Sequence, residues 1–561
     1  MYRFRFFGEK MEYISRCTAD RVRSPLDILR SRANTFLEDP GPYLSSIGPC
    51  VEVAPYSSAQ SCFNAASSWL SECLTSHTLC GEANPKILAS RLIDVGDSNY
   101  EPFLNINPPD SGKYVSLTYC WGGSDFKTTS ANLKHHSRQI SYRTMPKTYQ
   151  DAITICRRLR IRYLWIDALC IVQRNDETGE EGDWATESPR VPLIYQNATF
   201  TLAADAFGRI LAKLNLNGRL VYVREQLGRQ HNENSVCMRM PMTDVSRTDA
   251  ITKRAWTLPE AIFSNRVLHY TSDEMVWDCN ERRFCECGRT TIEVYETISF
   301  RIMRLPPENL KDKGFKDADL YRDWDDIVQL YSERTVGRPN DKLLALSKLA
   351  EKFNEILESY NISDTYLAGM WKKNMAKSLL WHVEDDDYRR NRDAGVVWSP
   401  LPSVDKRNNP TNMPPSWSWA SMNAPVLMRP LLGFETAPDF EIIEATTKNV
   451  GSAKFGMVSS GQLRVKGRVI EGLRDRSALA LFMRDDSRFS DSDYFGLFIG
   501  SVRWKQFDSN NYFGILLLQK VEGAYKRVGV SSRKIWANDG YHQKSFSKLL
   551  NNARVQVITI I

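Results

Sequence analysis

The chain of 561 residues contains only seven histidines and no apolar run near the roughly 20 residues that a membrane-spanning helix needs. This scarcity of histidine argues against a histidine-rich metal site. The Gly-x4-Gly-Lys-Ser/Thr pattern of a phosphate-binding loop, the GxGxxG pattern and internal repeats are also absent. The sequence therefore excludes an oligomerisation module driven by ATP at a phosphate-binding loop, and it excludes a repeat architecture.

An excess of basic residues is also lacking. The chain has 74 basic and 67 acidic residues, so its net charge of +7 is mild for this length and argues against a dedicated nucleic-acid binder. No apolar segment follows the basic start Met1-Tyr2-Arg3-Phe4-Arg5, so no secretory signal is predicted. We expect a cytoplasmic protein with neither a nucleic-acid nor a membrane partner.

Cysteine is frequent, with 12 residues spread through predicted core segments, which is typical of reduced, buried thiols. Two groups contain three soft ligands each: Cys73, His77 and Cys80, and then Cys279, Cys285 and Cys287. A structural zinc ion needs four ligands, and neither group has a fourth nearby in the sequence. We therefore predict free thiols and no metal site.

A strand, a helix and a second strand are predicted in the first half of the chain. Residues 114–120 are rich in β-branched and aromatic types and end at a glycine pair. An amphipathic helix is predicted from apolar residues at three- and four-residue steps: Tyr149, Ala152, Ile153, Cys156 and Leu159. Residues 163–172 are nearly continuously apolar, as in a strand of a parallel sheet. Residues 198–204 predict a third buried strand, and the order indicates a βαβ unit.

The period changes along the chain and indicates its organisation, for which the length suggests about three or four domains. We expect an irregular leader (1–60), a helical lead-in (61–110), an α/β domain (111–265), a mixed, mainly helical region (266–425) and a β-rich domain (426–561). Strict alternation over residues 462–469 predicts a half-buried strand. Further strands behind it favour a small antiparallel sandwich or barrel.

Ligands of open α/β sheets bind beyond the carboxyl ends of the strands. Tyr119, Trp121 and Gly122 follow the first predicted strand, and Asp167 is placed near the end of the second. A carboxylate in an apolar run must be paired or hydrogen-bonded. Asp167 is thus either a structural acid that fixes a loop or part of a ligand pocket, and the sequence leaves both open.

Several blocks carry a family resemblance. They are Tyr119-Cys120-Trp121-Gly122, Trp165-Ile166-Asp167, Ile194-Tyr195-Gln196-Asn197-Ala198 and Arg254-Ala255-Trp256 through Glu260. In this order they resemble the HET (heterokaryon incompatibility) domain of filamentous fungi, and further blocks extend the resemblance over residues 65–425. The resemblance implies non-self recognition, innate immunity and programmed cell death. It implies an α/β fold with a TIR/flavodoxin-like parallel sheet. Together with the change of period described above, the expected fold class is this core with a helical region and a C-terminal antiparallel β domain.

The likeness to TIR domains that cleave NAD implies an enzymatic role as well. Those domains carry a Trp and a nearby catalytic Glu on a helix, and Trp184 and Glu187 stand one turn apart here, so they should share a face. Glu187 is then the first catalytic candidate, with Asp167 beside it, while Tyr119, Trp121 and Gly122 line the pocket. NAD would be a substrate, and no cofactor is expected. A solvated residue or salt-bridge partner is the other interpretation of Glu187.

Two departures from the family pattern leave alternatives open. Pro189 and Pro192 should shorten or kink a helix that is continuous in relatives. Glu260 is a second candidate acid, but it can instead pair with Arg254. The alternative function is a non-enzymatic oligomerising signalling module or an inactive paralogue. In either case we expect self-association or another incompatibility protein as partner.

Overall fold

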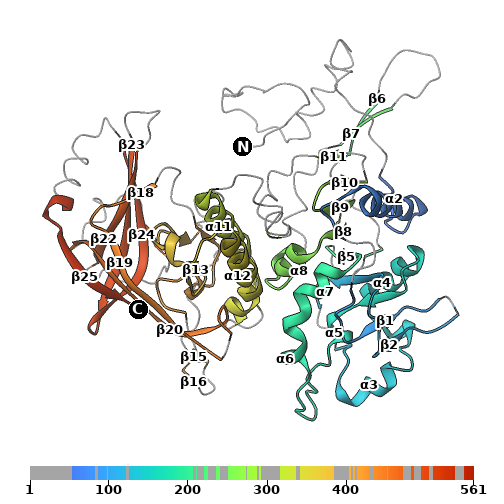
Figure 1. Cartoon of the computed structure of the whole chain (residues 1–561). Coiled ribbons are helices and arrows are strands. Elements are labelled where there is room, and N and C mark those ends of the chain that lie inside the picture. The colour runs from blue at the N-terminus through green and yellow to red at the C-terminus, as the bar shows by residue number, and fades with distance from the viewer. Residues whose placement is uncertain are drawn as a thin grey trace. The chain divides into compact units, whose positions relative to one another are not determined.

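The fold is given by a computed structural model of the chain (Figure 1). The structure describes residues 53–81, 86–97, 99–121, 125–205, 210–211, 220–224, 235–239, 250–272, 274–286, 290–291, 303, 316–336, 341–383, 404–405, 409–410, 414–428, 434–451, 453–471, 482–484, 494–503, 510–536 and 549–561. The predicted leader lies almost wholly outside these residues. The chain divides into two compact units, of which unit 1 is Met1–Ile251 with Asn265–Glu293 and unit 2 is Thr252–Ser264 with Val294–Ile561.

Unit 1 is built on a nine-stranded mixed sheet with the order β11-β10-β9-β8-β5-β3-β4-β1-β2. The strands are β1 Leu92–Asp94, β2 Phe103–Asn105, β3 Tyr114–Thr118, β4 Tyr163–Trp165, β5 Phe200–Ala203, β8 Arg266–Tyr270, β9 Met275–Cys279, β10 Arg283–Cys285 and β11 Thr290–Thr291. The central four, β4, β3, β5 and β8, are parallel, and antiparallel strands flank them on both sides. The sheet confirms an α/β unit with a parallel core.

The predicted strand–helix–strand unit is present, with one correction. Helix α4 (Lys147–Arg158) follows Pro146 and buries Tyr149, Ala152, Ile153 and Cys156. The register pairs β3 with β4 in parallel. The second strand is shorter than predicted, because the chain turns into the single helical turn α5 (Asp167–Cys170) directly after β4. The apolar run through residue 172 is buried in both conformations, so its composition could not separate a strand from a helical turn.

The proline pair divides its helix as predicted. Instead of one helix, the chain forms α6 (Trp184–Glu187), the 3₁₀ turn η3 (Ser188–Arg190) and α7 (Val191–Asn197). Each proline stands at the first or second position of a segment, where its missing N–H has no intrahelical partner. Residues 184–197 therefore stay helical, but as three short pieces.

The other described elements of unit 1 are α2 Gln60–Ser76, α3 Ser130–His136, the 3₁₀ turn η2 Tyr142–Thr144 and the hairpin β6 Leu220–Arg224 with β7 Ser235–Arg239. The 3₁₀ turn η4 Ala250–Lys253 crosses from unit 1 into unit 2. Helix α2 packs on β9, and Trp69 stacks on Phe284 with ring centres 6.3 Å apart. The two strands of the hairpin pair antiparallel over their whole length. Strand β1 lies between β4 and β2, because β2 returns alongside it.

Unit 2 contains a helical part that buries several tryptophans. Its elements include α8 Thr257–Phe263, α11 Asp317–Ser332, α12 Lys342–Ser359, β12 Tyr366–Leu367, β13 Met370–Trp371, η6 Lys372–Asn374, α13 Met375–Ser378, β14 His382–Val383, β15 Val404–Asp405, β16 Asn409–Pro410, η8 Trp419–Ser421 and β17 Val426–Leu427. Trp324, Trp371, Trp381, Trp417 and Trp419 are all less than 2% exposed. Their burial makes them packing anchors of this part of the unit.

The C-terminal strands of unit 2 form a largely antiparallel sheet, as predicted. They are β18 Phe434–Thr436, β19 Glu441–Asn449, β20 Val458–Ile470, β21 Phe482–Arg484, β22 Phe495–Arg503, β23 Asn510–Val521, β24 Ala524–Trp536 and β25 Arg554–Ile560. The order is β18-β22-β23-β24-β25-β20-β19, and an additional pairing of β22 with β20 closes a ring of strands. β20 alternates buried and exposed residues, as its sequence predicted.

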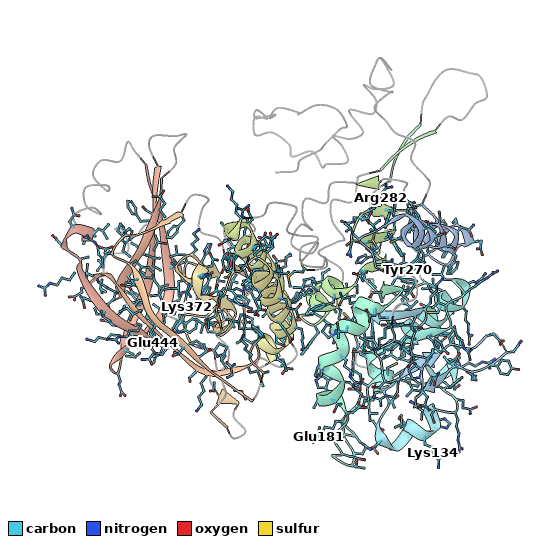
Figure 2. All side chains as sticks on the ribbon, viewed as in Figure 1. Lys134, Glu181, Tyr270, Arg282, Lys372 and Glu444 are labelled. Carbon is cyan, nitrogen blue, oxygen red and sulfur yellow. The ribbon has the colours of Figure 1, made fainter. Side chains whose placement is uncertain are left out.

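Figure 2 shows the side chains of both units, with Tyr270 inside unit 1 and Lys134 and Glu181 at its surface. Among the residues that the structure describes, none of the helices has the length and apolar character needed to cross a membrane.

Candidate functional site

The carboxyl ends of the parallel strands β4, β3, β5 and β8 meet at one edge of the sheet, so residues just beyond them gather there. Tyr119 and Trp121 follow β3, Asp167 follows β4, and Asp205 follows β5. This edge is the candidate functional site of unit 1.

The Asp167 carboxylate is held by two donors. Its Oδ2 accepts a hydrogen bond from the Trp121 indole Nε1 at 2.9 Å, and its Oδ1 accepts one from the Ala168 backbone N–H at 2.7 Å. Asp167 is the first residue of α5, where a carboxylate suits the unpaired N–H groups of a helix start. The carboxylate is only partly buried, so it combines fixed orientation with access.

Two phenols complete the cluster. The hydroxyls of Tyr119 and Tyr149 are 2.5 Å apart and their rings meet edge to face, with centres 5.3 Å apart. Burial, and next the charge of Asp167, raise the pKa of Tyr119 and the pKa of Tyr149. Both phenols are therefore neutral at physiological pH, and the structure brings Tyr119, Trp121 and Asp167 into one cluster.

A second pair on the same edge was missed by the sequence reasoning. His269 Nδ1 lies 2.9 Å from Asp205 Oδ2, and the two side chains are 13% and 1% exposed. The available signal was the position of Asp205 directly after a third buried strand, which parallels the position of Asp167. Gly122, predicted to line the pocket, lies outside the described residues.

Glu187 does not join this cluster. Its Oε1 accepts a hydrogen bond from Ser90 Oγ at 2.7 Å and lies 3.6 Å from Arg190 Nη1, while Arg190 donates to Ser90 at 3.0 Å. Glu187 is 5% exposed and Trp184 is 41% exposed, and both belong to the single turn α6. Glu187 is therefore buried against Ser90, while the shared face of the two residues stays a prediction.

Glu260, the second candidate acid, belongs to α8 and therefore to unit 2. Its backbone carbonyl accepts hydrogen bonds from the Ser264 N–H at 3.3 Å and the Ser264 hydroxyl at 2.7 Å. Asp167 and Glu187 belong to unit 1. The pairing of Glu260 with Arg254 stays a prediction.

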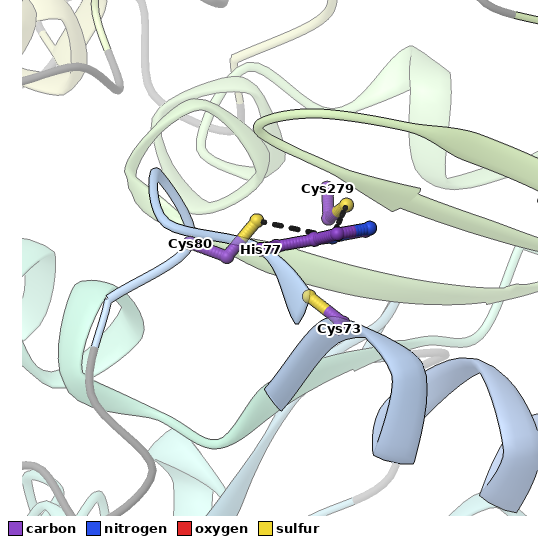
Figure 3. A group of neighbouring side chains, drawn as sticks. All are labelled: Cys73, His77, Cys80 and Cys279. Atoms are coloured by element: carbon purple, nitrogen blue, oxygen red, sulfur yellow. Dashed lines mark hydrogen bonds between the residues drawn. The ribbon is translucent and has the colours of Figure 1, made fainter. Parts of the chain in front are cut away.

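Four potential metal ligands also gather in unit 1, away from the carboxyl-edge residues named above. Cys73, His77, Cys80 and Cys279 place one ligand atom each within 4.8 Å of the others (Figure 3). The sequence contained the first three as a group, and the fourth comes from β9. Cys285 is disulfide-bonded, so the prediction of a free thiol is wrong for that residue. Cys287 lies outside the described residues.

The parallel core, with polar and aromatic side chains gathered at its carboxyl edge, makes unit 1 an α/β domain. Residues 114–260 match the family model described as heterokaryon incompatibility protein (HET), and the protein is therefore a HET-domain-containing protein. The match begins at the first residue of β3 and ends in α8. It points to a role in heterokaryon incompatibility. Searches of curated proteins and of solved structures found no match.

Proposed function

We propose that this HET domain acts in non-self recognition and programmed cell death by cleaving NAD at the carboxyl edge of its sheet. The observation that carries the proposal is the Asp167 carboxylate, which accepts hydrogen bonds from the Trp121 indole and the Ala168 backbone N–H just beyond the parallel strand β4. This arrangement combines a fixed negative charge with aromatic surface, and a cationic aromatic ring such as nicotinamide suits both.

The order of the parallel strands supports this location. In chain order they are β3, β4, β5 and β8, and in the sheet they lie as β4-β3-β5-β8, which is the order second, first, third, fourth. Flavodoxin-like sheets share this order and bind their ligand at the switch point between the first and third strands. Here that point lies between β3 and β5, and the proposal includes a TIR-like relationship for this core.

The reaction would proceed by hydrolysis. The bond between the ribose C1′ and the nicotinamide nitrogen breaks, nicotinamide leaves with the bonding electrons, and water adds to C1′ with release of a proton. Positive charge develops on the ribosyl ring as the bond weakens, and the Asp167 carboxylate would stabilise it. Asp205 lies two strands from Asp167, about 10 Å by strand spacing, where it can orient the rest of the ligand through His269.

The test is release of nicotinamide from NAD by the purified full chain, followed by chromatography. Asp167→Asn keeps the shape of the side chain and should lower the rate at least about 100-fold. Glu187→Gln should retain most activity, because Glu187 is engaged by Ser90 and Arg190, and Glu260→Gln is measured beside it as the second candidate acid. Loss of product in Glu187→Gln alone would transfer the role to Glu187 and refute the Asp167 assignment.

A second candidate function is a non-enzymatic module that self-associates. The favouring observation is exposed apolar surface on the broken helix, where Trp184 is 41% and Leu193 is 46% exposed. Absence of nicotinamide at every protein concentration, together with concentration-dependent assembly that Leu193→Ser abolishes, would choose this function. Assembly could involve copies of the chain or another incompatibility protein.

A further inference from the structure

The carboxyl end of helix α2 approaches strand β9 through a set of soft side chains. Cys73 lies in the last turn of α2, His77 is the residue that ends it, and Cys80 follows in the next turn. Cys279 ends β9, about 200 residues later in the chain. Figure 3 shows the three sulfur atoms around the imidazole ring of His77.

The spacing of these atoms fits one tetrahedral ion. His77 Nδ1 lies 3.6 Å from Cys80 Sγ and 3.4 Å from Cys279 Sγ. A zinc ion with bonds of about 2.3 Å to sulfur and about 2.0 Å to nitrogen separates its sulfur and nitrogen ligands by about 3.5 Å. All four ligand atoms lie within 4.8 Å of one another, so small side-chain shifts bring them to one centre.

The chemistry of the set is that of a structural zinc site. Three cysteines and one histidine are a common closed ligand set, with no position left for water. The three cysteines are at most 1% exposed. His77 Nε2 is buried without a hydrogen-bond partner among the described residues, and thiols are weak partners for the other ring nitrogen. A metal bond to Nδ1 would give the imidazole the strong partner that it otherwise lacks.

The surroundings supply donors to the sulfur atoms. Arg266 Nε donates to Cys73 Sγ at 3.2 Å, and the Arg282 backbone N–H donates to Cys279 Sγ at 3.3 Å. Hydrogen bonds of this kind orient and tune metal ligands. Arg266 is only 2% exposed, and its other hydrogen bonds go to the carbonyls of Thr199 and Gly81.

Charge balance connects this arginine to the cluster. A buried cation needs a nearby negative charge. Three thiolates and one divalent ion carry a net charge of −1, which the Arg266 guanidinium neutralises. Three neutral thiols would leave the guanidinium without this counter-charge.

We propose that Cys73, His77, Cys80 and Cys279 bind one zinc ion that fastens α2 and the turn after it to β9. A zinc ion at this position replaces the prediction of no metal site, which rested on the lack of a fourth ligand close in the sequence. The neighbouring backbone fits this role, because Asn280 Nδ2 donates to the Leu79 carbonyl at 2.8 Å and Glu281 accepts from the Leu79 N–H at 2.6 Å.

The experiment measures zinc in the purified, reduced full chain by mass spectrometry of the metal. We expect about one zinc ion per chain, and at least about tenfold less in Cys279→Ser. Cys156→Ser is the matched control, since Cys156 is equally buried but lies in α4 outside the cluster, and it should keep the zinc. Absence of zinc from the wild-type chain, after reconstitution with zinc as well, would overturn the proposal.

Loss of zinc through misfolding needs a separate measurement, because Cys279 is buried. His77→Cys keeps four ligands and should retain the metal. Cobalt substituted into this variant should show tetrahedral absorption bands shifted to lower energy than those of the wild-type protein, because sulfur replaces nitrogen in the ligand set. An unchanged cobalt spectrum in His77→Cys, or equal zinc in Cys279→Ser and the wild type, would refute the ligand assignment.

Discussion

Lys342 is a buried lysine whose replacement should stabilise unit 2. It is the first residue of α12 and is 3% exposed. Its ammonium group donates to the Met422 carbonyl and lies 5.0 Å from the centre of the Trp419 ring. Burial lowers the pKa of Lys342 from its usual 10.5 to about 7. Burial disfavours the charged ammonium group in the folded state only. The side chain therefore lowers the stability of the folded state wherever the unfolded chain carries the proton, that is, below its usual pKa of 10.5.

The magnitude follows from that pKa difference. The fall of the pKa from 10.5 to about 7 corresponds to about 5 kcal/mol of unfolding free energy, because each tenfold change in proton affinity is worth about 1.4 kcal/mol. The Met422 carbonyl and the Trp419 ring are among the contacts that favour the charged form. The unfolded chain binds more protons between pH 7 and pH 10.5, so stability rises with pH across this window. The destabilisation is complete below about pH 7 and is lost above about pH 10.5.

Lys342→Met keeps the apolar stem and removes the amine, but it also takes the ammonium donor from the buried Met422 carbonyl. We therefore expect a gain of roughly 1–3 kcal/mol, below the full value, at about pH 6.5, and this gain shrinks towards about pH 9.5. Scanning calorimetry of both proteins across this range measures the gain as a difference in Tm. Lys348→Met is the control, because Lys348 lies in the same helix but pairs with Glu351 at the surface. Equal Tm differences at all pH values, or a loss of stability at low pH, would refute the reasoning.

Two further substitutions, each with a control, test a close packing contact in unit 2 and a buried hydrogen bond in unit 1. Gly369→Ala should cost more than about 2 kcal/mol, since φ is +96° and the added Cβ would lie 2.5 Å from Trp419 Nε1, whereas Gly451→Ala, with φ +74° and open space, should lower the Tm far less. Tyr149→Phe should lower the stability of unit 1 by about 1 kcal/mol because it removes the hydroxyl partner of buried Tyr119. Tyr100→Phe, at a residue 70% exposed, should leave the thermal midpoint unchanged, and equal shifts in the two variants would contradict the role of this bond.

Local periodicity predicted the elements whose partners are close in the chain. The helical spacing around Tyr149 predicted α4, and Pro189 and Pro192 predicted the divided helix, because both effects arise within a few residues. The meeting of Trp121 with Asp167 followed from a rule about parallel strand ends. The continuous apolar run was less informative. Residues 163–172 are apolar in the strand and in the helical turn alike, so their composition did not reveal the change of conformation at Asp167.

Features that depend on distant segments could not be predicted. Cys279 joins Cys73, His77 and Cys80 only because β9 passes α2, and nothing near residue 80 signals this. Glu187 was placed by family resemblance, whereas its orientation depends on Ser90, which lies about one hundred residues earlier. In both cases the sequence shows the chemistry of the side chain. It does not show the neighbours of that side chain, because segments far away in the chain supply them.

The route of the chain through the two units has a practical consequence. α8 belongs with unit 2, yet the next residues return to unit 1 to form β8, which pairs with β5. A fragment cut at Glu260 would leave β5 with unpaired backbone groups along one side, and one that starts at Tyr114 would also strip β1 from β4. Such a fragment would expose two unpaired strand edges and would aggregate. Biochemical work on this HET domain therefore requires a fragment that extends well beyond the region of family similarity.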